Sequence, residues 1–95
     1  MANKRDLKKD IDYLVYEVVS DCFTVMTVKS DEKADKITEV VSDAVKLRND
    51  LFARVNHPDG KKNPGMVKSY YTSIRLDLIK GIDSLFERIS EIAKV

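Results

Sequence analysis

The side chains best suited to nucleophilic or acid–base chemistry are Cys22 and His57, the only cysteine and the only histidine in the sequence. A catalytic pair would have to lie within hydrogen-bond distance. Helical periodicity instead places Cys22 on the apolar stripe of a first helix, level with Ile37 of a second. Roughly 20 helical residues separate Ile37 from His57, or about 30 Å. We therefore expect no catalytic residues, a protein that is not an enzyme, and a small buried apolar role for Cys22.

Metal and cofactor chemistry has as few candidate groups. One cysteine and one histidine cannot supply the common zinc ligand sets. There is no Glu-x-x-His pair of the kind that di-iron bundles use, and no glycine-rich phosphate loop. Acidic pairs such as Asp31-Glu32 fall at a helix start, where solvation and the helix dipole explain them. We expect no metal site, no cofactor and no small-molecule substrate.

The loop between the second and third predicted helices contains the one short motif with a chemical precedent. In His57-Pro58-Asp59, the proline cannot continue a helix and disfavours helical geometry at the residue before it. Asp59-Gly60 is a turn pair, since glycine accepts positive φ. Turn chemistry alone accounts for these residues, and about eight loop residues allow the next helix to fold back.

His57-Pro58-Asp59 between two antiparallel helices also resembles the signature loop of J-domain co-chaperones, and the following Lys62-Asn63-Pro64 is similar to that family's loop. The resemblance covers about ten residues. The helix before the loop is long and charge-balanced, where J-domains carry a short basic one. The resemblance implies stimulation of a partner chaperone's ATPase, with His57 and Asp59 as the interacting residues.

Three amphipathic segments must position these residues. Each carries apolar side chains at intervals of three and four, the period of a helix with one buried face. In the first segment these are Leu7, Ile11, Leu14, Val18, Cys22 and Val25. In the second they are Ile37, Val40, Val41, Ala44, Val45, Leu47, Leu51, Phe52 and Val55. In the third they are Val67, Tyr71, Ile74, Leu78, Ile82, Leu85, Ile89 and Ile92, with Ile79, Phe86 and Ala93 at the margin.

The predicted fold is all-α, a single domain (1–95) that forms an antiparallel up-down-up three-helix bundle. The long helices span about 4–28, 31–56 and 64–94. The segment 23–28 is rich in β-branched residues and could be read as a strand. We predict helix there, because the helical period continues and no second strand exists to pair with it. The chain as a whole resembles the small all-helical proteins of bacterial genomes.

Arg48 interrupts the apolar stripe of the second helix. Antiparallel register places it level with Asp12 on the first helix and near Tyr71 on the third, so these are the expected partners of a snorkelling guanidinium. The alternative is an anion site between helices.

Tyr16, Val19 and Phe23 widen the apolar face of the first helix to about half of its circumference. Two interpretations fit this width. Two neighbouring helices could cover the face, or the three residues could form a seam for self-association or a partner. Tyr13 points elsewhere and is expected to be exposed.

Charge and composition narrow the function classes. Seventeen basic and sixteen acidic side chains give a net charge of +1, so we expect no nucleic-acid partner. No apolar run approaches the roughly 18 residues of a membrane span, and the charged N-terminus lacks a secretory core segment. One cysteine fits a reducing compartment.

We expect a non-enzymatic cytoplasmic interaction or structural module, with a protein partner or a homodimer. The alternative is a J-domain-like regulator of a chaperone ATPase.

The J-domain alternative predicts that the protein stimulates ATP hydrolysis by a cognate chaperone and that His57→Gln abolishes the stimulation. Steady-state ATPase measurements with equal amounts of the two proteins test this. An unstimulated chaperone, or a variant as active as the wild type, would remove the alternative.

Overall fold

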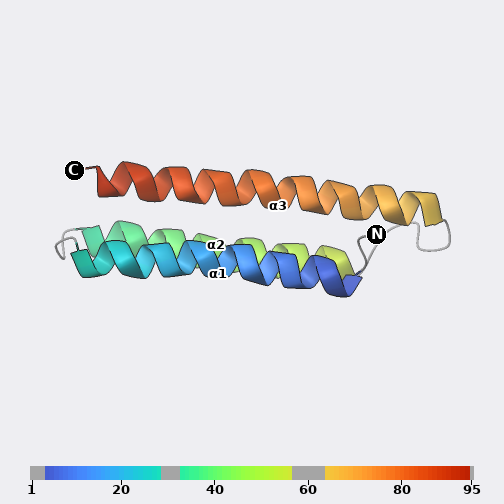
Figure 1. Cartoon of the computed structure of the whole chain (residues 1–95), viewed down its shortest axis with the longest axis horizontal. Coiled ribbons are helices and arrows are strands. Elements are labelled where there is room, and N and C mark those ends of the chain that lie inside the picture. Colours follow the sequence, from blue (N-terminus) through green and yellow to red (C-terminus); the bar gives the residue numbers. More distant parts are fainter. Residues whose placement is uncertain (1–3, 29–32, 57–63, 95) are drawn as a thin grey trace.

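The computed structural model describes residues 4–28, 33–56 and 64–94, and these residues form three long helices. They are α1 (Lys4–Val28), α2 (Ala34–Asn56) and α3 (Pro64–Ala93). α1 and α3 run in the same direction along the rod and α2 runs against them (Figure 1). Each helix packs against both others. The predicted all-α up-down-up three-helix bundle is therefore confirmed.

The helix ends agree closely with the sequence prediction. α1 spans the predicted 4–28, and α3 begins at Pro64, where a missing N–H is tolerated because the first turn has no intrahelical acceptor. α3 ends one residue before the predicted 94. A tight turn at Lys33 precedes α2, and the predicted start at residue 31 lies outside the described residues.

The β-branched end of α1 is helical, not extended. Thr24 donates its hydroxyl to the carbonyl of Ser20 at 3.1 Å, and Thr27 donates to that of Phe23 at 2.9 Å. These bonds to the residue four positions back satisfy the hydroxyl within the helix. The segment therefore contributes its apolar side chains to the helical faces of α1.

The core is one apolar seam with five buried side chains from each helix. These are Leu7, Ile11, Val15, Val18 and Cys22; Ile37, Val40, Ala44, Leu51 and Val55; and Ile74, Leu78, Ile82, Leu85 and Ile89. Among the described residues no polar or charged side chain is buried. The predicted core was too wide: Val45 and Ile79 are exposed, and several other predicted core residues, Leu14 among them, are only half-buried. In a bundle of three, each helix meets only two neighbours, so the buried stripe is narrower than the apolar pattern.

The rod is long and thin, measuring 52 × 17 × 17 Å with a radius of gyration of 15.5 Å. A compact domain of 95 residues would have a radius of gyration of about 12 Å. A rod of this width has no interior beyond its seam. A binding site formed by the described residues therefore has to lie in the grooves between helices or on their outer faces.

α3 continues unbroken through Gly81, which contacts α2. A Cβ atom placed on Gly81 would lie 2.7 Å from Cδ2 of Leu47, closer than van der Waals contact. The missing side chain lets Leu47 pack directly against the backbone of α3. This close approach accounts for a glycine in the middle of a helix, where it otherwise costs about 1 kcal/mol relative to alanine.

Truncation of the seam should be costly in proportion to burial. Leu51→Ala and Leu78→Ala should each lower the free energy of unfolding by about 2–5 kcal/mol, because each leaves a cavity that the rod cannot close. Leu14→Ala should cost less, since Leu14 is half-buried. Urea denaturation followed by circular dichroism measures all three, and equal small losses would contradict the core assignment.

Candidate functional site

Four arginine–aspartate ion pairs join neighbouring helices at the surface of the bundle. Arg48 of α2 pairs with Asp12 of α1 at 2.6 Å, and Arg75 of α3 pairs with Asp10 of α1 at 2.6 Å. Two more join α2 and α3: Arg54–Asp77 at 2.8 Å and Arg88–Asp43 at 2.7 Å. The paired side chains are 34–53% exposed, so each bridge contributes at most about 1 kcal/mol.

The Arg48–Asp12 pair confirms one predicted partner of Arg48. The guanidinium also donates to the Asn49 side chain and lies over the Phe52 ring, with 4.1 Å between Cζ and the ring centroid. The Arg48 charge is thus engaged by a carboxylate and an aromatic ring. The ion-pair interpretation is correct, and this bridge crosses the α1/α2 groove in the N-terminal half of α1.

On one side of this bridge the α1/α2 groove is apolar. Counting by helical turns from Asp12 along α1 leads to Tyr16, Val19, Phe23 and Met26, and counting back from Arg48 along α2 leads to Val45 and Val41. We call these six residues the apolar face. Tyr16, Phe23, Met26 and Val45 are 72%, 59%, 39% and 43% exposed, and Val19 and Val41 are half-buried.

Tyr16 and Phe23 are therefore not covered by neighbouring helices, and that interpretation of their position was wrong. Tyr13 is exposed, as predicted. The outer border of the apolar face on α1 is formed by residues 20, 24 and 27, all Ser or Thr. The acidic residues of this part of α1, at positions 17 and 21, follow Asp10 by two and three helical turns and share its side, toward α3. The apolar face is thus long, exposed and uncharged.

On the other side of the Arg48–Asp12 bridge the same groove is basic. A cleft of about 480 Å³ is lined by Lys4, Arg5, Lys8, Lys9, Asp12 and Phe52. Lys8 lies over the Phe52 ring, with its Nζ 5.6 Å from the centroid. We call this the basic cleft. The sequence did not single it out, although Lys4 and Lys8 lie four residues apart, as do Arg5 and Lys9.

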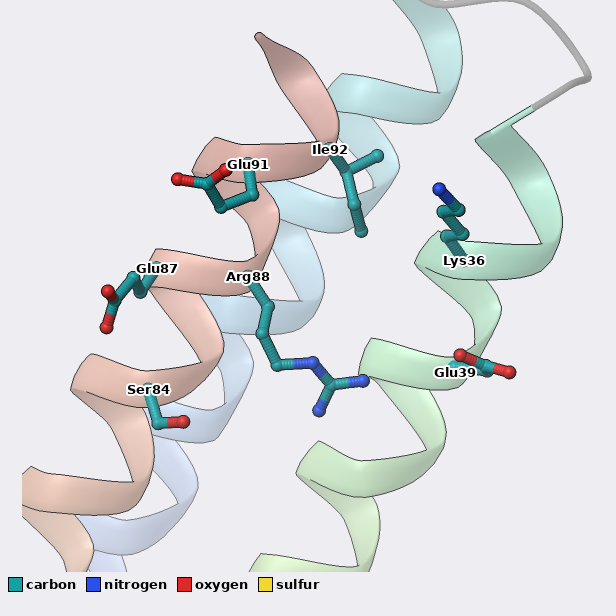
Figure 2. Close-up of a pocket in the computed structure, with 7 residues that line it drawn as sticks. All are labelled: Lys36, Glu39, Ser84, Glu87, Arg88, Glu91 and Ile92. Atoms are coloured by element: carbon teal, nitrogen blue, oxygen red, sulfur yellow. The ribbon is translucent and has the colours of Figure 1, made fainter. Parts of the chain in front are cut away.

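A second hollow of about 430 Å³, as open to solvent as the basic cleft, lies between α2 and α3 near the C-terminal end of α3. Figure 2 shows Arg88 reaching across it toward α2, where the guanidinium pairs with Asp43. Glu87 and Glu91 point away from α2, so the groove does not bring carboxylates together. Nearby, the Lys33 ammonium donates to the Ile92 carbonyl, where the last turn of α3 leaves carbonyls without intrahelical partners. The groove holds a structural contact and no convergent chemical groups.

Cys22 is fully buried in the seam, as predicted. Burial raises the pKa of its thiol, the neighbouring Asp21 carboxylate raises it further, and Arg88 acts in the opposite direction. The thiol is therefore neutral and inaccessible, which is the opposite of an activated nucleophile. His57 and Asp59 lie outside the described residues, so the proposed role of their loop stays a prediction.

Neither a metal-ligand cluster nor a membrane-spanning helix is found among the described residues. No three of their histidine, cysteine, aspartate or glutamate side chains gather where they could hold a metal ion. No helix within 4–28, 33–56 or 64–94 has both the length and the apolarity required to span a bilayer. Comparison of the chain with protein-family models, curated proteins and solved structures yields no significant match. The described surface offers two features suited to binding, the apolar face and the basic cleft.

Burial of the Cys22 thiol predicts that it reacts slowly in the native protein. A thiol-reactive reagent should modify native protein far more slowly than protein unfolded in urea, because reaction requires opening of the seam. The folded state has the raised pKa, so its contribution to stability is complete below the unfolded thiol's pKa of about 8.5 and is lost as pH rises further.

Cys22→Ala is the matched reference for this pH dependence. The difference in free energy of unfolding between wild type and Cys22→Ala should be constant below about pH 8 and shrink above it. A difference that stays constant up to pH 10, or rapid labelling of the native protein, would contradict the burial of the thiol.

Proposed function

We propose that the chain is a non-enzymatic cytoplasmic interaction module that pairs with a second copy of itself through the apolar face. The observation that supports this is the exposure of Tyr16 and Phe23 on one uninterrupted apolar stripe. Contiguous exposed apolar surface of this kind characterises protein–protein contacts, and aromatic side chains often supply most of their binding energy. The lone cysteine is compatible with a reducing cytoplasm.

Self-pairing suits the apolar face because a two-fold interface brings the same patch of both copies together. A charged patch would then oppose its own charge, whereas this face is bordered by Ser20, Thr24 and Thr27. No desolvated charge has to be matched in such a contact. The face therefore meets the first requirement of an isologous dimer, which is self-complementarity.

The shape of the rod decides how two copies would lie. An end of the 17 Å-wide rod offers on the order of 300 Å², well below the roughly 800 Å² per partner of a standard interface. Parallel side-by-side packing over the full length would set the basic cleft against its own copy. An antiparallel, staggered arrangement overlaps the apolar halves and points the basic ends away from each other. Because only part of the rod's length takes part, the area buried per partner should fall short of a standard interface, so the dimer should be weak and concentration-dependent.

Analytical ultracentrifugation over a range of concentrations tests the proposal. We expect a monomer–dimer equilibrium with a dissociation constant in the micromolar range or above, little affected by salt because the face is uncharged. The double variant Tyr16→Ser/Phe23→Ser should weaken dimerisation about tenfold or more. Its thermal stability should change little, since both side chains are exposed.

Tyr13→Ser is the matched control, because Tyr13 is an equally exposed aromatic of α1 that lies outside the apolar face. It should dimerise like the wild type. A protein that is monomeric at every concentration, or a control that loses dimerisation as fully as the double variant, would overturn the proposal.

A further inference from the structure

We propose that the basic cleft is a second, independent docking site, and that it takes an acidic segment of a partner protein. The site lies beyond the Arg48–Asp12 bridge from the apolar face, so it shares no residue with the dimer contact. Four cationic side chains and one carboxylate line it. That carboxylate, Asp12, already pairs with Arg48.

Arg5 distinguishes this cleft from the rest of the surface by its lack of an ion pair with any described residue. The other four arginines, at positions 48, 54, 75 and 88, each pair with an aspartate of another helix. Within the described part of the chain, no carboxylate pairs with Arg5, Lys4, Lys8 or Lys9. The fold thus uses its other guanidinium groups to join helices and leaves this cationic group facing the cleft. Arginine presents a planar fork of donors that matches a carboxylate.

Phe52 gives the cleft a component that a plain lysine cluster lacks. The Lys8 ammonium and the Arg48 guanidinium both lie over its half-buried ring. These cation–π contacts hold both cations beside an aromatic surface. The aliphatic stems of the surrounding lysines extend that apolar surface. A ligand that matches the site therefore combines carboxylates with an apolar side chain.

Charge along the rod favours a short acidic protein segment over a nucleic acid. The described residues at the cleft end (4–13, 48–56 and 64–77) include eight basic and five acidic side chains. The remaining described residues include six basic and eight acidic side chains. A nucleic acid needs a basic track along its phosphate backbone. Here the excess of positive charge is confined to one end, and the other half of the rod carries the uncharged apolar face and a slight excess of acidic side chains. The cleft can accept a few carboxylates at one place.

Fluorescence anisotropy with a labelled oligoglutamate peptide that contains one central phenylalanine tests the proposal. The full-length protein should bind this probe at about 50 mM salt and more weakly at about 200 mM, because exposed charges are screened. Arg5→Gln/Lys8→Gln/Lys9→Gln should weaken binding about tenfold or more. Oligoglutamate without phenylalanine should bind more weakly than the probe.

The control is Lys36→Gln/Lys46→Gln/Lys80→Gln, which removes the same charge from the opposite half of the rod. It should bind the probe like the wild type. Equal loss in both triple variants would reduce the effect to net charge and overturn the proposal, as would the absence of binding at low salt. Tighter binding of oligothymidylate would identify a nucleic acid as the occupant, and loss of self-association in the cleft variant would identify a second copy. Either result also overturns the proposal.

The proposals for the basic cleft and for the apolar face can be tested separately. Tyr16→Ser/Phe23→Ser should leave probe binding unchanged, and the cleft variant should leave dimerisation unchanged. Salt distinguishes the two contacts as well, since it weakens a charged contact and spares an apolar one.

Discussion

The exclusion of water from a seam of five apolar side chains per helix is the constraint on which this structure depends. No polar side chain of the described residues is buried in the seam, so burial there opposes the entropy of ordering without a desolvation cost. Such a seam is strong and unspecific, because leucine, isoleucine and valine tolerate alternative registers. The close contact between Leu47 and the backbone at Gly81 is one local feature that fits a single register of α2 against α3.

The register between helices otherwise depends on ion pairs at the rim of the bundle. There, each pair of helices is joined by at least one arginine–aspartate bridge. Each bridge is half-exposed and adds little stability. Its effect is on specificity, because a shift of one turn would leave a cation and a carboxylate unpaired at several places at once. Apolar burial thus holds the helices together, and the ion pairs favour one register between them.

The sequence was sufficient for the fold because periodicity reports directly on burial along a helix. Pro64 and the stripes through Leu51 and Leu78 predicted helix ends and core positions that the structure confirms. Prediction was weaker at the edges of each stripe, at Val45 and Ile79, because periodicity cannot say how many neighbours cover a helix. The Arg48–Asp12 pair followed from antiparallel register, whereas Arg75–Asp10 and the two α2–α3 bridges required the actual rotation of each helix. For the same reason the basic cleft was missed: its cations come from the start of α1, but the aromatic wall that defines it comes from α2.

A bundle of three helices leaves an outer groove between α1 and α2, opposite α3, and here that groove changes chemistry at a single ion pair. Before the Arg48–Asp12 bridge it offers cations beside Phe52, and after the bridge it offers Tyr16 and Phe23. A ligand that spanned both halves would be oriented along the rod, since the wrong direction would set its carboxylates on an apolar surface. The bridge belongs to the fold, yet it also divides the two proposed contacts. Because Asp12 pairs with Arg48, the cations of this groove that have no carboxylate partner among the described residues are those in the first turns of α1.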